Sequence, residues 1–367
     1  MSEPEFTFEL RVCQWAEREW PPEGTLSDDR VALVARQLGV RERRWDTLIV
    51  ECDADALAAR AVFGDERLDS DLLHVVRNAP DEWAYYRDAL PDPGYPWRYV
   101  REAVHDAADR DAVETRRAGN RIEIRRRWHY PDWVERIVAV ENKPDLDAAA
   151  ADALADQIER DVALGLADEV WVATRATGDR IEPALFEDLP VEAGILAFDD
   201  GAADGGGGTD PDAAPGAAQE GGERASVVWR PSALAVDEPG TRIRERPEGA
   251  TATGDRSAAR FEYVDPEWKR GKRLEIAERA YERGWRAYAD TMRTDCRHFR
   301  LRRHDGDVLP WCGAKRRGPT GRECSGSCPE FAPEPPAWRT RGWPIEGGPG
   351  KGFERLLARR RERVRRP

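Results

Sequence analysis

Lysine is almost missing from this chain of 367 residues. A single lysine, Lys143, occurs before residue 269, and arginine supplies every other side-chain cation of that stretch apart from histidine. The two side chains differ in chemistry, because lysine is a compact point charge whose pKa can be lowered, whereas arginine is a broad fork that stays protonated. The scarcity of lysine elsewhere indicates that position 143 requires an ammonium group.

Long apolar runs and a targeting signal are missing as well. No apolar run approaches the roughly 18 residues that a membrane span needs, and the acidic stretch 1–9 lacks the charged-then-apolar pattern of a signal peptide. We therefore expect a cytoplasmic protein with no membrane partner. In a reducing cytoplasm, clustered cysteines indicate a metal site more than disulfides.

Negative charge dominates the chain, but unevenly. Residues 1–259 carry 31 Lys+Arg and 55 Asp+Glu, whereas residues 260–367 carry 27 and 16. An acidic composition with little lysine and abundant Ala, Asp, Glu and Arg is typical of proteins from salt-loving archaea, in which acidity maintains solubility and does not identify a substrate. The basic C-terminal third is the part whose charge predicts a partner.

Composition also divides the chain into segments. Residues 1–200 alternate helical and strand patterns, whereas residues 201–259 are rich in Gly, Ala, Asp and Pro. The second segment can bury too little apolar surface to fold, which predicts a disordered linker between parts that fold independently. A basic helix starting at Pro266 and a four-cysteine module make up residues 260–335, and a basic tail makes up residues 336–367.

Periodicity and capping residues predict the elements of the first 200 residues. Helices are expected at 5–19, 27–38 and 148–166, and strands at 44–51, 134–141, 169–173 and 194–198. An insertion at 53–131 contains helices and a basic β-hairpin at 112–128. The order strand, helix, strand, strand after this insertion favours an α/β sandwich with a mixed sheet.

An apolar strand ends in the string Ile137-Val138-Ala139-Val140-Glu141-Asn142-Lys143. Alternation along a strand places Glu141 and Lys143 on one face. A carboxylate beside an amine is typical of metal-dependent phosphodiesterase sites, where the carboxylate holds a hard divalent cation and the lysine orients or deprotonates the attacking water. The alternative is an exposed ion pair worth under about 1 kcal/mol, which arginine would form equally well.

Together with a following helix that carries Gln157 and the apolar strand Val170-Trp171-Val172-Ala173, the Glu141-Asn142-Lys143 string resembles the PD-(D/E)XK nuclease superfamily. The resemblance covers residues 5–200 at most. It implies a restriction-endonuclease-like α/β core in which a strand aspartate and Glu141 bind Mg²⁺ or Mn²⁺, while Lys143 assists the water. Gln157 resembles the helical glutamine of RecB-like members.

The resemblance leaves two acidic positions to be assigned. Either Glu9 or Glu17 would match the acid that many members carry on the first helix. For the strand aspartate, Asp132 lies about 30 Å from Glu141 if both belong to one extended strand at roughly 3.3 Å per residue, so only a tight reversal would let them share a cation. Asp46 opens a separate strand that can lie beside Glu141, at the cost of an insertion of about ninety residues between the two motifs. We favour Asp46.

Four of the six cysteines cluster near the C-terminus. They are Cys296, Cys312, Cys324 and Cys328, spaced C-x15-C-x11-C-x3-C. Four thiolates in a short, turn-rich segment suit a tetrahedral structural Zn²⁺, which would stabilise a module too small to fold by itself. A four-cysteine iron–sulfur cluster and unligated thiols are the alternatives. His298 and His304 are candidate substitute ligands, whereas Cys13 and Cys52 lie in apolar contexts and are expected to be buried.

Arginine-rich surfaces predict a nucleic-acid partner. The hairpin follows a helical stretch at 96–110, and a helix with a basic hairpin resembles the wing of a winged helix, which lays arginines against phosphates. A charged hairpin that offsets nearby acids is the alternative. In the C-terminal third, arginines accompany Trp285, Trp311, Trp338 and Trp343, which suits phosphate neutralisation and base stacking. We expect this third to bind DNA or RNA, the alternatives being an acidic partner protein and the chain's own acidic half.

These observations predict a Mg²⁺-dependent DNA nuclease with a catalytic domain at 1–200 and a basic, metal-stabilised binding module. One alternative is a non-catalytic nucleic-acid-binding protein on a decayed nuclease fold. Another is a metal-stabilised protein-interaction factor.

Overall fold

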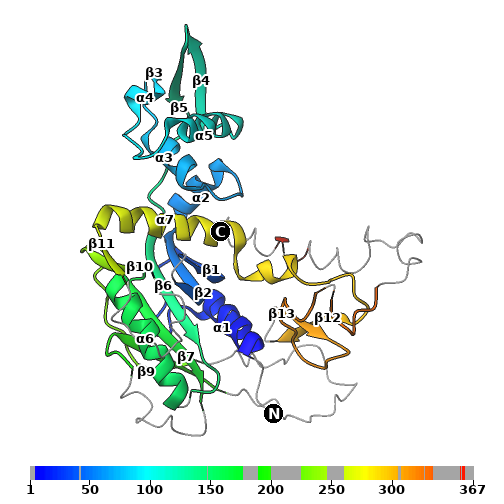
Figure 1. Ribbon diagram of the computed structural model, residues 1–367. Coiled ribbons are helices and arrows are strands. Elements are labelled where there is room, and N and C mark those ends of the chain that lie inside the picture. Colours follow the sequence, from blue (N-terminus) through cyan, green and yellow to red (C-terminus); the bar gives the residue numbers. More distant parts are fainter. Residues whose placement is uncertain are drawn as a thin grey trace.

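The computed structural model describes residues 5–40, 43–146, 148–176, 189–199, 225–245, 260–304, 307–325, 327–333, 356 and 358–359. A six-stranded mixed sheet forms its body (Figure 1). In spatial order the strands are β1 (Arg30–Gly39), β2 (Arg44–Asp53), β6 (Val134–Asn142), β7 (Glu169–Arg175), β8 (Ala193–Phe198) and β9 (Ala225–Trp229). The contacts of β6 with β7 and of β7 with β8 are parallel, and the other contacts are antiparallel. The predicted α/β class with a mixed sheet is confirmed.

Strand β1 corrects the helix predicted at 27–38. Five consecutive apolar residues at 31–35 fit either a buried strand or a buried helix, because periodicity alone does not separate the two. Pairing with β2 decides for the strand, and alternate side chains enter different cores, with Leu33 on one face and Val34 on the other.

Helices cover both faces of the sheet (Figure 1). Helices α6 (Ala148–Leu164) and α7 (Pro266–Arg283) share one core with the side chains of Ile137 and Ala139. Helix α1 (Glu5–Glu19) packs on the opposite face, against Val138 and Val140. The residues of β6 therefore alternate between the two cores up to Glu141, at the end of the strand.

The C-terminal segment packs against the N-terminal part. Its elements are the 3₁₀-helix η4 (Trp285–Asp290) and the hairpin of β12 (Phe299–His304) and β13 (Asp307–Cys312). Trp285, Phe299 and Leu309 belong to the same core as α1, which lies between the sheet and this hairpin (Figure 1). The expectation of independently folding parts is therefore wrong, because α7 and the hairpin complete the cores that the N-terminal elements begin.

The predicted linker contains regular structure wherever the structure describes it. Strand β9 pairs with β8, and β10 (Gly240–Glu245) pairs with β11 (Arg260–Val264). The other residues of 201–259 lie outside the described part, apart from the connection between β9 and β10.

The insertion between β2 and β6 forms a separate lobe at the top of Figure 1, which we call the inserted lobe (residues 54–131). Its elements are α2 (Ala54–Arg60), η1 (Ala61–Phe63), α3 (Ser70–Asn78), β3 (Ala84–Tyr85), α4 (Tyr86–Ala89), α5 (Trp97–Asp109), β4 (Val113–Ala118) and β5 (Arg121–Arg126). The lobe has a hydrophobic core of its own, centred on α3 and α5. Strands β4 and β5 form the predicted basic hairpin.

None of the described helices combines the length and the apolar character of a membrane span.

Candidate functional site

Strands β2 and β6 bring Asp46 and Glu141 together. Thr47 pairs with Val140 in antiparallel register, so the next residues, Asp46 and Glu141, are cross-strand neighbours on the same face. Asp46 Oδ2 accepts a hydrogen bond from the backbone N–H of Asn142 at 3.0 Å. The aspartate and glutamate thus lie beside each other at one edge of the sheet.

Asp132 lies at the opposite end of β6. It is exposed and precedes the first residue of the strand, Val134, whereas Glu141 is the last residue but one. The strand between them is extended and makes no reversal, so the two carboxylates are about 30 Å apart at roughly 3.3 Å per residue. Only Asp46 is placed to share a ligand with Glu141.

Glu9 of α1 joins this pair through Gln37 of β1. The Gln37 side-chain amide donates one hydrogen bond to Glu9 Oε1 at 3.0 Å and another to Asp46 Oδ1 at 2.9 Å. Gln37 has φ 53°, a left-handed conformation that residues other than glycine rarely adopt. Such backbone costs about 1–3 kcal/mol and clusters at functional sites, where surrounding contacts hold it.

Arg36 neutralises part of the charge on Glu9. Its Nε and Nη2 atoms donate to the two Glu9 carboxylate oxygens, both at 3.0 Å. Burial raises the pKa of Glu9 and the nearby Asp46 charge adds to the rise, while Arg36 and Gln37 oppose it. Glu17, the other candidate on α1, instead pairs with Arg286 at 2.5 Å, on the side of the C-terminal segment.

Arg43, in the connection between β1 and β2, joins Glu141 to helix α6. Its Nη2 donates to Glu141 Oε1 at 2.6 Å and to Asp161 Oδ2 at 2.8 Å, and its Nε donates to Asp161 Oδ1 at 2.8 Å. Neither Arg43 nor Asp161 was predicted. A signal existed for Asp161, because it follows Leu154 and Ile158 on the apolar stripe of α6, where an acid needs a buried partner.

The candidate site therefore contains more negative than positive groups. Its four carboxylates and two guanidinium groups leave an excess of two negative charges when all are ionised. Burial raises the pKa of Glu141 to about 8, and the charge of Asp46 raises it further while Arg43 lowers it. Burial also raises the pKa of Asp161. One divalent cation would match this excess.

The side chains do not yet form a coordination shell. Across the described residues, no group of three or more His, Cys, Asp or Glu side chains is arranged to hold a metal ion. In the carboxylate cluster, N–H groups of Gln37 and Arg43 bind oxygens of Asp46 and Glu141 that would otherwise face a cation. These N–H groups are the positive partners of the cluster in this arrangement.

Lys143 is turned away from Glu141, contrary to the expectation that the two side chains share a face. It lies just beyond β6, where its backbone N–H donates to the carbonyl of Ala173, and its ammonium contacts Glu5 Oε1 of α1 at 3.2 Å. Alternation no longer applies past the end of a strand. Gln157 is partly buried on α6, one turn before Asp161 and on the same side of the helix.

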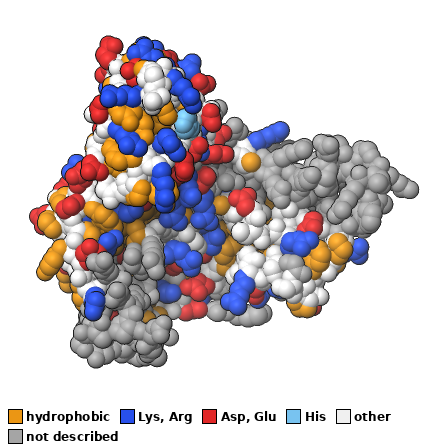
Figure 2. Space-filling model, turned by 45° about the horizontal axis from the view of Figure 1, so that its top comes forward, with side chains coloured by type: hydrophobic (Ala, Val, Ile, Leu, Met, Phe, Trp, Pro, Cys, Tyr) orange, Lys and Arg blue, Asp and Glu red, His pale blue; other side chains and the backbone are white. Residues whose placement is uncertain are grey.

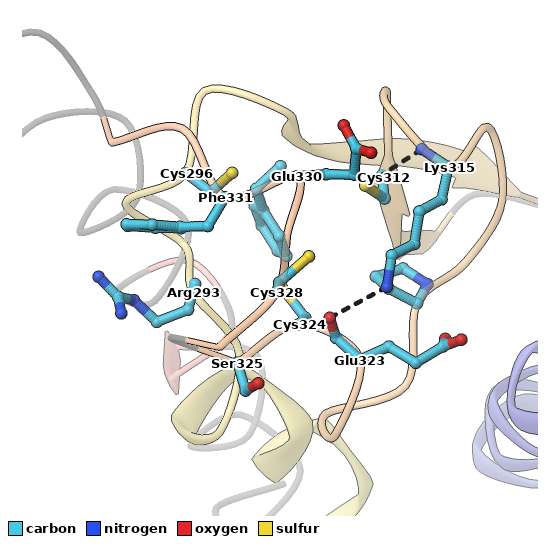
Figure 3. Close-up of a pocket in the computed structure, with 12 residues that line it drawn as sticks. Arg293, Cys296, Cys312, Lys315, Glu323, Cys324, Ser325, Cys328, Glu330 and Phe331 are labelled. Atoms are coloured by element: carbon cyan, nitrogen blue, oxygen red, sulfur yellow. Dashed lines mark hydrogen bonds between the residues drawn. The ribbon is translucent and has the colours of Figure 1, made fainter.

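The four clustered cysteines line one small pocket of about 20 Å³ in the C-terminal segment (Figure 3). Their thiols are free, and burial and the other three thiols raise the pKa of Cys324. The backbone N–H of Lys315 approaches Cys312 Sγ at 3.5 Å. His298 is not among the lining residues, and the side chain of His304 lies outside the described part.

The cations of α7 bind inside the molecule. Lys269 Nζ donates to the carbonyls of Ala235 and Glu238, at 2.6 and 2.9 Å, and Arg273 pairs with Asp168 at 2.7 Å. Of the alternatives for the basic segment, the chain's own acidic half is therefore the partner for these side chains.

The tryptophans expected to stack on bases have other environments where the structure describes them. Trp285 is buried and donates to Glu17 Oε1 at 3.2 Å, which corrects its assignment as a stacking surface. Trp311 lies under Arg302, whose guanidinium carbon is 3.4 Å from the ring centroid. Trp338 and Trp343 lie outside the described residues, as does the basic tail apart from 356 and 358–359.

Comparison with known proteins gives one match. Residues 33–333 match DUF5787, a family of unknown function, and this span includes Asp46, Glu141, Lys143 and the four clustered cysteines. Neither the curated proteins nor the solved structures contain a significant match. Since the match covers most of its length, the chain belongs to the DUF5787 family.

Proposed function

We propose that the protein is a Mg²⁺- or Mn²⁺-dependent nuclease whose metal ligands are Glu9, Asp46 and Glu141. The observation that carries this proposal is the convergence of three carboxylates from α1, β2 and β6 on one edge of the sheet. In support of a restriction-endonuclease-like core, β6 is followed by α6, which carries Gln157, and then by the parallel strand β7.

The donor set fits a hard divalent cation. All three ligands offer carboxylate oxygens, the kind that Mg²⁺ and Mn²⁺ prefer. Bound there, the cation would polarise a phosphate oxygen and make a bound water more acidic. Glu141 can turn toward it without isolating Arg43, because the guanidinium keeps both of its hydrogen bonds to Asp161.

Lys143 supplies the second cationic group of the proposed site. Its pair with Glu5 joins two partly exposed side chains, so separating them costs under about 1 kcal/mol. The released ammonium would bind a phosphate oxygen or hold the attacking water, and Gln157 would help to position the substrate from α6.

Binding of Mn²⁺, followed by calorimetry or by electron paramagnetic resonance, tests the ligand set. Replacing Asp46 with Asn should weaken binding at least about tenfold, since one of three carboxylate ligands is lost. Asp132→Asn is the matched control at the other end of the same sheet pair and should leave binding unchanged. Equal binding by wild type and Asp46→Asn would rule out this ligand set.

A non-catalytic nucleic-acid-binding protein on a decayed nuclease fold is the second candidate. Two observations favour it: the ammonium of Lys143 faces Glu5, and Arg43 binds Glu141. Under this alternative the arginine is a permanent structural partner, and no divalent cation binds the cluster.

We also propose that Cys296, Cys312, Cys324 and Cys328 bind a structural Zn²⁺. Support comes from four thiols around one pocket and from the small size of the hairpin module that they join. The N–H group near Cys312 Sγ would stabilise a thiolate at that position. An iron–sulfur cluster remains the alternative for this donor set.

A further inference from the structure

The inserted lobe has the layout of a helix-turn-helix with a β-hairpin attached. Helices α3 and α5 pack together in its core, the short β3 and α4 lie between them in sequence, and the β4–β5 hairpin directly follows α5. The three strands form an antiparallel sheet in the order β3-β5-β4. In Figure 1 the hairpin projects away from the body of the molecule. This layout presents one helix and one hairpin to an external partner.

Helix α5 has one buried and one exposed face. Val100, Ala103, Val104 and Ala107 form the buried stripe. The first turns expose Arg98, Tyr99 and Arg101, whereas the acidic residues of the exposed face begin at Glu102 and continue to the end of the helix. In helix-turn-helix proteins the N-terminal part of the second helix contacts base edges, and here that part is basic.

The hairpin arginines fall into two groups. Near its base, Arg125, Arg126 and Arg127 form ion pairs with Glu114, Asp81 and Asp111. This agrees with the hypothesis of a charged hairpin that offsets nearby acids. The tip differs: among the described residues Arg117 has no ion pair, and Arg121 is 3.9 Å from Asp88, with both side chains largely exposed.

The lobe also differs in charge from its surroundings. It carries 13 arginines and 15 acidic residues, whereas the rest of residues 1–259 carry 18 Lys+Arg and 40 Asp+Glu. Figure 2 shows Lys and Arg side chains over the lobe and in a band below it on the same face. An anionic polymer therefore meets less repulsion here than elsewhere on the acidic part of the chain.

We propose that the inserted lobe binds double-stranded DNA, with α5 in the major groove and Arg117 and Arg121 of the hairpin tip on the phosphate backbone. B-form DNA is the polymer that this shape fits, because its major groove of about 12 Å admits an α-helix, whereas side chains do not reach the bases in the deep, narrow major groove of an RNA duplex. Arg98 and Arg101 lie where they would reach base edges or the flanking phosphates. The lobe would thus select duplex DNA as the substrate class of the proposed nuclease, and to that extent the inference rests on the proposed function.

Binding of the full-length protein to a labelled DNA duplex of about 20 base pairs, followed by fluorescence anisotropy across a series of salt concentrations, tests the proposal. EDTA in the buffer separates binding from cleavage, so failure of one can be told from failure of the other. Arg98→Ala/Arg101→Ala and Arg117→Ala/Arg121→Ala should each weaken binding about tenfold or more and make its salt dependence less steep, by about one per lost phosphate contact.

The matched control is Arg67→Ala/Arg110→Ala, which removes the same charge from the part of the lobe nearest α7. These arginines pair with Glu282 and Glu66, all in exposed or partly exposed positions, and their loss should change affinity less than about threefold. Equal losses for the control and the two test pairs, or unchanged binding in both test pairs, would overturn the proposal. Equal affinity for single-stranded DNA or for duplex RNA would also overturn it. Circular dichroism melts check that each variant is folded.

Discussion

At the scale of single residues, Lys143 carries the sharpest prediction. Lys143→Ala, and Lys143→Arg nearly as much, should abolish cleavage while changing the free energy of unfolding by less than about 1 kcal/mol, because the partly exposed pair with Glu5 contributes little. Nuclease assays and denaturant melts measure the two effects. Glu5→Gln, which removes only the partner, should remain active, and a fully active Lys143→Arg protein would contradict the assigned role.

Glu141 gives a prediction about pH. Burial raises its pKa in the folded state to about 8, above the ordinary value of 4.5. Between these values the native state holds a proton that the unfolded chain releases, so the free energy of unfolding falls as pH rises. In EDTA, Glu141→Gln should therefore melt at a higher temperature than wild type at about pH 9, with little difference at about pH 4.

Glu135→Gln is the control for this comparison. Glu135 lies near the start of the same strand, in a partly exposed pair with Arg30, so its neutralisation should not reproduce the effect. A Glu141→Gln variant that is less stable than wild type at high pH would show that the ion pair with Arg43 outweighs burial.

At the scale of elements, sequence patterns predicted the strands that carry the candidate site. The runs that form β2 and β6 are apolar in the middle and polar at the ends, and α1 and α6 are set by periodicity. Strand β1 was mistaken for a helix because pairing with β2, a long-range contact, decides between two locally acceptable conformations.

The same limit applies inside the site. Asp46 and Glu141 were expected to be neighbours because adjacent strands place residues at similar depth. The direction of Lys143, the bridge formed by Gln37 and the reach of Arg43 depend on where a strand ends and how a turn folds. Such features involve single torsion angles and leave no periodic signal in the sequence.

The contact between α2 and α7 gives a prediction about stability. Arg60 and Glu278 are both completely buried and form two hydrogen bonds of 2.6 Å, and Glu278 also accepts from Tyr130 and from the backbone of Leu68. Glu278→Ala leaves a buried guanidinium without its partner, so it should cost about 3–5 kcal/mol in chemical denaturation.

Glu275→Ala is the control on the same helix. Glu275 pairs with Lys272 at 2.7 Å in a partly exposed position, so the substitution should cost under about 1 kcal/mol. Similar losses for the two variants would mean that the buried pair has no special weight in the α7 contact.

At the scale of the whole molecule, the four-cysteine site should affect more than its own module. We expect one tightly bound, colourless zinc per chain, because zinc thiolate sites do not absorb visible light. Since Cys296 belongs to the core that also contains α1, removing the metal should lower the melting temperature of the protein as one cooperative unit.

Elemental analysis and melts with and without a strong chelator test this expectation. Iron with a brown absorbance would favour the cluster, and a protein without metal would refute the proposed site. A chelated protein that loses only the C-terminal transition would show that the shared core is not cooperative.

The distribution of charge over the whole molecule was visible in the sequence, but its meaning was not. The excess of cations after residue 260 predicted an external anionic partner, yet Lys269 and Arg273 of α7 bind acceptors within the chain. A charge count does not report which groups face each other, and that information comes only from packing.

Cleavage of DNA by the purified protein tests the central claim most directly. Wild type, Glu141→Gln and the control Glu135→Gln are incubated with single- and double-stranded DNA in high salt, with Mg²⁺, with Mn²⁺ or with EDTA. The account predicts cleavage that requires the divalent cation, persists in Glu135→Gln and is lost in Glu141→Gln. No cleavage by the wild type under any of these conditions, or cleavage that Glu141→Gln retains in full, would contradict it.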